Sequence, residues 1–266
     1  MNPMRLPLDR TLNAPTLFLV LVMTCCHTDG LRAAPDEPRE QPGWDFQIGL
    51  PLWASGLDGT TGVRGRKADV DEDFSDIVDI LDFAAALNVE VRRQPWLLFA
   101  NGLYAKTTTD AEPGGLLGGI INDVELEQKQ FLLDFGLGYN ITPRRPVSLE
   151  LFAGGRLQYL DAEISVEFPA SDASFSGSKT WIDPIFGLMA QWRLSRHFTL
   201  FAEGDAGGFG VASDLTWQAQ GGLEWTINRH LYLRGGYRHL VTDFEDDGFT
   251  YDMTQGGPLL ELGLRF

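Results

Sequence analysis

The chain has 266 residues, and acidic residues outnumber basic ones so far that the formal net charge is −16 at pH 7. This charge argues against nucleic-acid binding, which needs a basic surface. Mean hydropathy is slightly negative, and no apolar run beyond the N-terminus reaches the roughly 18 residues of a membrane helix, which excludes a helical membrane protein. Thirty glycines and 11% aromatic residues favour twisted sheets with many turns over helices.

The N-terminus has the pattern of an export signal. Arg5 and Arg10 precede an apolar run over residues 17–26, which is too short to cross a bilayer as a helix but suits a signal peptide. We expect cleavage near Ala33 or Ala34.

The signal peptide therefore covers residues 1–34, and it holds both cysteines of the chain. Cys25 and Cys26 are either lost with it or, as the alternative, one of them carries a lipid. A polar linker follows over residues 35–43, and residues 44–266 form one domain.

Ten segments of that domain alternate in hydrophobicity with the period of a β-strand. The connections alternate as well, with short ones at 93–95, 142–146, 195–196 and 228–229, and the longest at 55–81. Tight turns at one end and long loops at the other are typical of outer-membrane barrels, with both termini in the periplasm when the strand number is even. The predicted fold is all-β, a single antiparallel transmembrane barrel with an up-and-down meander of about ten strands, at residues 44–54, 82–92, 96–106, 123–140, 147–165, 179–194, 197–206, 214–227, 230–243 and 250–266.

Side chains alternate between the two faces of a strand, and here one face is free of charge while the other carries it. Ten strands enclose little more space than side chains fill, so the charged face lines either a salt-bridged, closed lumen or a narrow water-filled pore. The predicted lumen-facing charges are Asp45, Glu90, Arg92, Asp134, Glu150, Arg156, Asp183, Arg193, Glu203, Asp205, Glu224, Arg234, Arg238, Glu261 and Arg265.

Three features predict that the uncharged face contacts lipid, against the alternative of a soluble barrel with that face inside. Each apolar stretch has the nine to eleven residues of a tilted membrane strand. Aromatic residues cluster at both ends of these stretches, as they do at membrane interfaces. The exported chain ends on Phe266, which resembles the signal read by the barrel-assembly machinery, so we expect that machinery and outer-membrane lipid as partners.

The longest connection contains Asp69, Asp71 and Asp73, spaced as in a calcium loop. Phe74 stands where that loop requires glycine, so we interpret the segment as a solvated acidic loop. Apolar residues at helical spacing after Asp73 predict a short amphipathic helix, which either plugs the barrel mouth or rests on its rim.

No motif predicts catalysis, a cofactor or a metal. The glycine-rich segment 207–213 lacks the lysine and the strand-turn-helix context of a phosphate loop, and we interpret it as a tight external hairpin. His197 and His230 lie by the short turns and His239 points outward, so an outer-membrane protease or lipase lacks its histidine site.

Residues 44–266 resemble a widespread family of poorly characterised outer-membrane β-barrel proteins of Gram-negative bacteria. The resemblance implies fold and location but no settled substrate. It is carried by Trp53 ahead of Leu57-Asp-Gly59, by Trp181-Ile-Asp-Pro184, by Gly204-Asp-Ala-Gly-Gly-Phe-Gly210 with Ser213-Asp214, by Gly236-Tyr-Arg238 and by Phe266.

The sequence thus predicts a non-enzymatic integral outer-membrane barrel of structural or narrow-channel type. The alternative is a porin-like passive transporter of small solutes or ions, and an outer-membrane protease or lipase is the weaker third hypothesis.

Overall fold

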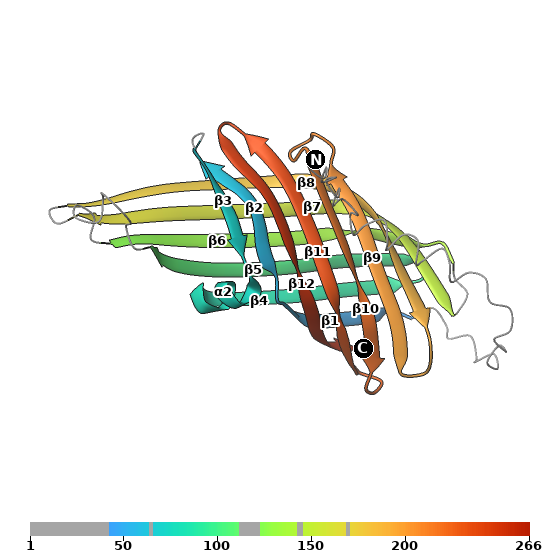
Figure 1. Cartoon of the computed structure of the whole chain (residues 1–266). Coiled ribbons are helices and arrows are strands. Elements are labelled where there is room, and N and C mark those ends of the chain that lie inside the picture. The colour runs from blue at the N-terminus through green and yellow to red at the C-terminus, as the bar shows by residue number, and fades with distance from the viewer. Residues whose placement is uncertain (1–42, 64–65, 112–122, 143–145, 169–170) are drawn as a thin grey trace, which may run out of the picture. The chain divides into compact units, whose positions relative to one another are not determined.

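A computed structural model describes residues 43–63, 66–111, 123–142, 146–168 and 171–266 of the chain (Figure 1). The predicted signal peptide, its two cysteines and all but the last residue of the predicted linker lie outside the described residues.

The described residues form twelve strands and one short helix. Each of the ten predicted strand segments is present as a strand, with ends that differ by up to eight residues. The helix is α2 (Phe74–Ile80), and the strands are β1 (Asp45–Trp53), β2 (Gly56–Val63), β3 (Arg66–Glu72), β4 (Leu81–Arg93), β5 (Trp96–Ala111), β6 (Asp123–Asn140), β7 (Val147–Phe168), β8 (Ser171–Arg193), β9 (Phe198–Gly208), β10 (Leu215–Thr226), β11 (Leu231–Asp246) and β12 (Phe249–Arg265).

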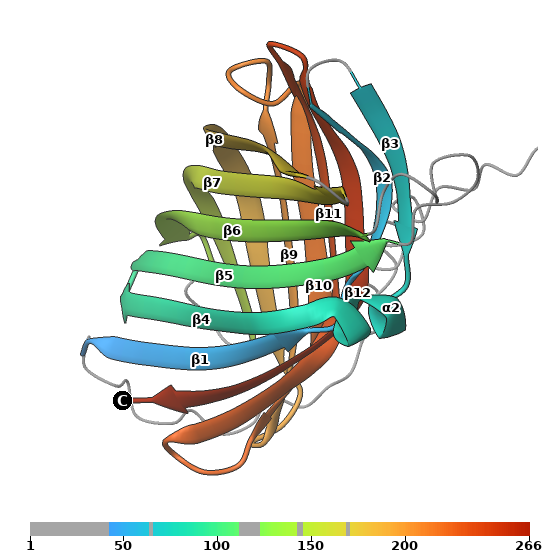
Figure 2. The ribbon, with the colours of Figure 1, turned by 90° about the vertical axis from the view of Figure 1, so that its left-hand side faces the viewer.

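The strands close into a barrel. From β4 to β12 each strand pairs antiparallel with the next in sequence, and β1 pairs with both β4 and β12. The closing register runs from Gln47 opposite Arg265 to Trp53 opposite Leu259, and Figure 2 shows β1 between β4 and the C-terminal part of β12. Closure leaves no open edge along the paired length, and the prediction of an up-and-down antiparallel barrel with a ten-stranded wall is confirmed.

The longest predicted connection, at residues 55–81, is mostly strand and helix, and the interpretation of its acidic stretch as a loop is wrong. β2 continues the line of β1 and pairs with β12 from Gly56 opposite Gly256 to Gly62 opposite Thr250. The acidic stretch forms β3, which pairs with β2. These residues lack apolar alternation, and they form strands because the N-terminal half of β12 extends past β1 and offers them an edge.

The predicted helix after Asp73 is confirmed as α2, with Asp73 as its N-cap residue. None of its residues is buried, and it contacts β2 and β5, so it lies on the rim and is not a plug. β1 pairs with β4 only from Asp45–Gly49, and α2 lies where the two strands have separated (Figure 2). In the described part of the chain, no helix is long and apolar enough to cross a membrane.

We call the end of the barrel with the short turns at 94–95, 194–197 and 227–230 the turn end, and the opposite end the loop end. The C-terminus lies at the turn end, where Phe46 and Phe266 exchange backbone hydrogen bonds of 3.2 and 2.9 Å. β5 to β8 are long strands of 16, 18, 22 and 23 residues, and they lie side by side in Figure 1.

Inward glycines make room for large side chains of neighbouring strands. A Cβ at Gly136 would lie 2.8 Å from the ring of Phe99, and one at Gly187 would lie 2.4 Å from the ring of Phe152. The two rings meet edge to face at 5.1 Å. They form a buried apolar cluster on the inner wall of β5, β7 and β8, together with Leu97, Ile185 and Met189.

The tightest of these side-chain contacts predicts a stability effect. A Cβ at Gly263 would lie 2.1 Å from the Tyr232 ring, and Tyr232 is buried, with its hydroxyl donating to Glu261. Gly263→Ala should therefore lower the free energy of unfolding by ~1–3 kcal/mol. The measurement is urea unfolding in lipid vesicles. The matched control is Gly235→Ala, because a Cβ there meets nothing within 4 Å, and equal losses for the two variants would contradict the prediction.

Candidate functional site

The interior of the barrel gathers most of the ionisable residues that the sequence assigns to the lumen. Arg193 is the exception, because it is exposed at the turn end of β8. Asp45, Glu90, Arg92, Glu203, Arg234, Arg238 and Arg265 are half-buried. The buried ones are Asp134, Glu150, Arg156, Asp183, Asp205, Glu224 and Glu261.

The central network is built on Arg156, whose side chain is fully buried. Its Nε donates to Asp134 Oδ1 at 2.7 Å, and its Nη2 lies 3.1 Å from the Asp205 carboxylate. Its Nη1 donates to the Thr216 hydroxyl at 3.0 Å. Arg238 Nη2 also reaches Asp134, at 3.3 Å. These bonds connect β6 and β7 with β9, β10 and β11 across the lumen.

A second set of ion pairs, the turn-end network, lies nearer the C-terminus. Arg234 on β11 pairs with Glu224 at 2.9 Å, with Glu261 at 3.5 Å and with Glu90 on β4 at 3.6 Å. Arg92 joins Glu90 to Glu150 on β7. Further bonds come from Tyr232 and Asn88 to Glu261, and from Arg265 to Glu224. Each carboxylate in this network thus has a cationic partner, as buried charges require.

An apolar cluster, the aromatic cap, occupies the lumen at the loop end. Trp181 on β8 stacks on Phe244 on β11, with ring centroids 4.2 Å apart and an interplanar angle of 13°. Trp181 Nε1 is buried and has no hydrogen-bond partner among the described residues. The cap consists of Leu160, Trp181, Phe244, Tyr251 and Met253. The prediction from the sequence names only charged residues for the lumen and so misses this cluster. Trp181 is two residues from the inward Asp183 on β8, so strand alternation places it on the same inner face.

Four of the residues that carry the family resemblance form two contacts inside the barrel. The Asp183 carboxylate accepts from the Ser213 backbone N–H at 2.8 Å and from the Ser213 hydroxyl at 2.6 Å, and both residues are buried. This contact holds the β9–β10 hairpin against β8, and the interpretation of the hairpin as a tight connection is confirmed. Arg238 lies over the Trp53 ring at 4.6 Å.

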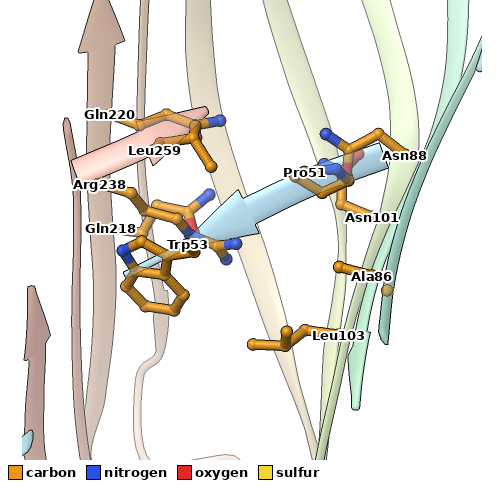
Figure 3. A pocket seen from close by; sticks show the side chains of 11 residues that line it. Pro51, Trp53, Ala86, Asn88, Asn101, Leu103, Gln218, Gln220, Arg238 and Leu259 are labelled. Carbon is orange, nitrogen blue, oxygen red and sulfur yellow. The ribbon is translucent and has the colours of Figure 1, made fainter. Parts of the chain in front are cut away.

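Two small cavities lie between these groups. One has a volume of about 30 Å³, and Figure 3 shows Arg238, Gln218 and Gln220 on one side of it, with Asn88 and Asn101 on the other. The second has about 40 Å³ and shares four lining residues with the first. A water needs roughly 10–15 Å³, so each cavity has room for a few waters. Both linings mix polar and apolar side chains, and the small volumes suit water or a small ion better than an organic solute.

The outer surface is apolar over the middle of the barrel. Leu50, Leu52, Phe186 and Leu262 are between 49 and 71% exposed, while inward neighbours such as Gln47, Asp183 and Glu261 are buried. Aromatic residues follow at both ends of this band. At the turn end they are Trp44, Trp96, Tyr139, Trp192, Phe198, Trp225 and Phe266, and at the loop end Tyr104, Tyr159 and Trp217.

Such a band would be costly in water, because soluble monomers rarely expose contiguous apolar surface of this extent. A charged interior and an apolar exterior between two aromatic girdles match a barrel in lipid. The chain is a transmembrane β-barrel. The layout is that of outer-membrane barrels, with short turns at one end and long strand pairs at the other.

Solved outer-membrane proteins resemble this barrel at low identity. The outer-membrane protease OmpT from Escherichia coli has 11% identity and a TM-score of 0.46, over 84% of this chain and 96% of its own. The translocator domain of the autotransporter NalP from Neisseria meningitidis has 12% identity and a TM-score of 0.43, over 86% of this chain and 90% of its own. Ail, the attachment invasion locus protein of Yersinia pestis, has 16% identity and a TM-score of 0.35, over 85% of this chain and 100% of its own. No protein-family model and no curated protein matches the sequence.

Two histidines of the transmembrane barrel contact an aromatic ring and a backbone carbonyl oxygen. The His239 ring lies 5.1 Å from Trp217, and His230 Nδ1 contacts the Arg265 carbonyl oxygen at 3.1 Å. In the described part of the chain, no ring nitrogen of His197, His230 or His239 hydrogen-bonds a carboxylate or a serine hydroxyl. Within the same residues, no group of three metal-ligating side chains forms a metal site.

Beyond the loop-end girdle, β5 and β6 continue with charged side chains. Lys106 and Lys129 lie 2.8 and 2.6 Å from the Glu127 carboxylate. Hydrogen bonds from Lys106 and then Lys129 hold the pKa of Glu127 below its usual value. This ladder keeps the strand extension charged where it leaves the lipid.

Proposed function

We propose that the chain is a closed outer-membrane barrel that does not conduct ions or solutes, and that its working surface is the loop end with the long β5–β8 strands. The central network is the most direct support for a lumen that does not conduct. Arg156 has no exposed surface, and with Arg238 it connects opposite walls of the lumen through Asp134. The turn-end network and the aromatic cap fill the lumen on either side of it.

Buried ion pairs resist opening for an energetic reason. Separating one partner would leave its counterpart uncompensated in a site of low dielectric constant, which costs several kcal/mol per ion, roughly 3–5. A permeating ion would have to displace such bonds at the central network and again at the turn-end network. Structural barrels with few strands are filled by side chains in the same way.

The second candidate is a narrow ion path. Its support is the pair of adjacent cavities, which share Asn88, Asn101, Gln220 and Leu259. Glu203 accepts from Gln218 and Gln220 beside this path, at 3.3 and 2.7 Å. If this path conducts, it should favour cations, because acidic side chains outnumber basic ones in the predicted lumen.

Single-channel recording in planar bilayers decides between the two. We expect the wild-type barrel to be silent across preparations, with a known porin as the positive control for insertion. A steady, ion-selective current would contradict the closed barrel and support the narrow path. In that case Glu203→Gln should lower the cation selectivity, whereas Lys106→Gln, which lies outside the lumen, should leave it unchanged.

A further inference from the structure

The charges exposed at the two ends of the barrel differ in sign. At the turn end, Arg93, Arg196 and Arg229 are exposed, one in or beside each described turn. We call these three residues the basic collar. The described acidic residues of this end are Asp45, Glu90, Glu150, Glu224 and Glu261, and none of them is exposed.

The loop end carries the opposite charge. Exposed acidic residues there lie on β3, on α2 and its flanks, and on the β9–β10 and β11–β12 hairpins. The described ones include Asp71, Glu72, Asp73, Asp76, Asp79, Asp82, Asp214, Asp246, Asp247 and Asp252. Among the described residues, the exposed charge is therefore distributed unevenly, with an excess of acid at one end and a basic rim at the other.

Each arginine of the collar lies where the apolar band ends. The Arg93 guanidinium lies 5.2 Å above the Trp44 ring, a girdle residue that is 57% exposed. Arg196 is two residues from the exposed Phe198, and Arg229 is two residues from the exposed Ile227. Among the described residues, no carboxylate lies within ion-pair distance of any of the three.

We infer that the basic collar binds the phosphate groups of anionic phospholipids in the leaflet that surrounds the turn end. This inference rests on the proposed function insofar as the turn end is placed at the periplasmic face of the membrane. A guanidinium at this depth is within reach of lipid phosphates, which it binds with charge-assisted hydrogen bonds. Unpaired cations near an anionic surface contribute roughly fivefold in binding each.

The test is competitive lipid binding by the purified full-length barrel. The protein in mild detergent is mixed with equal amounts of phosphatidylglycerol and phosphatidylcholine, and native mass spectrometry counts the retained lipids. We expect wild-type protein to retain phosphatidylglycerol preferentially, and the triple variant R93Q/R196Q/R229Q to lose at least fivefold of that preference. Added salt should weaken the preference in the wild type, because exposed charges are screened.

Two further variants separate charge from structure. R93K/R196K/R229K keeps the charge and should keep most of the preference. K106Q/K129Q/K179Q removes three cations at the loop end and should leave it unchanged. Equal retention of the two lipids by the wild type, or an undiminished preference in the glutamine variant, would overturn the assignment. Loss of the preference in the lysine variant would also overturn a role of charge.

The same preparations are recorded in planar bilayers. If the barrels are silent but show no lipid preference, the basic collar fails and the closed barrel stands. If they conduct and still prefer phosphatidylglycerol, the closed barrel fails and the basic collar stands.

Discussion

Replacing Arg156 by alanine is expected to destabilise the barrel by ~3–5 kcal/mol, because the change leaves the buried Asp205 carboxylate without a cation and takes one of two cations from the buried Asp134. Among the described residues, Arg156 is the one ion-pair partner of Asp205, whereas Asp134 keeps Arg238 at 3.3 Å. Thr216 loses the guanidinium that donates to its hydroxyl. The measurement is urea unfolding in vesicles, followed by tryptophan fluorescence.

Two controls show whether the loss comes from unpaired charge. Asp205→Asn in the Arg156→Ala background removes the stranded carboxylate and should recover a substantial part of the lost stability. Arg196→Ala removes an exposed arginine and should change stability by no more than ~0.5 kcal/mol. If Arg156→Ala cost under about 1 kcal/mol, the central network would not hold the lumen closed.

The barrel itself could be predicted from the sequence because lipid and a filled lumen impose opposite requirements on alternate residues. Leu133 and Asp134 are neighbours in sequence, yet one faces outward and the other is 1% exposed. The alternation of side chains along a strand assigns each residue to a face without any knowledge of which strands pair. The short turns supplied the strand count, because each of them separates two alternating segments.

The partners inside the lumen could not be predicted in the same way. Parity puts Asp134 and Arg238 on the inner face but does not say that they meet, and they are 104 residues apart in sequence. Their contact depends on the tilt and stagger of the strands, which the sequence pattern does not encode residue by residue. The same holds for Arg92 and Glu150, or for Arg234 and Glu90.

Residues 55–81 show a different limit. β2 and β3 contain glycine, threonine and charged residues without an apolar stripe, so local pattern predicts a loop. The edge of β12 decides their structure, and that edge is supplied by a strand nearly 200 residues later. The helix could be predicted because its signal, Asp73 and the apolar spacing after it, is local.

The aromatic cap carries the second large effect. Trp181→Ala should lower the free energy of unfolding by ~3–5 kcal/mol, since it removes the ring that stacks on Phe244 and leaves a cavity in a cluster that is almost fully buried. The deletion also opens space at the loop end of the lumen beside Gln158, which is paired with Trp181 in the β7–β8 register. Urea unfolding in vesicles measures the loss, and planar-bilayer recording of the same variant shows whether the central and turn-end networks still block ions.

Trp181→Phe is the matched control, and it follows from an unusual feature of the cap. Because Trp181 Nε1 has no described partner, phenylalanine keeps a ring against Phe244 and removes a buried donor that costs ~1–3 kcal/mol when it is unsatisfied. The smaller ring forfeits some packing, so the two effects oppose each other and the net loss should stay below about 1.5 kcal/mol. Equal losses for alanine and phenylalanine would mean that the indole N–H is bonded after all, and that polar contacts close this end of the barrel where stacking is proposed to do so.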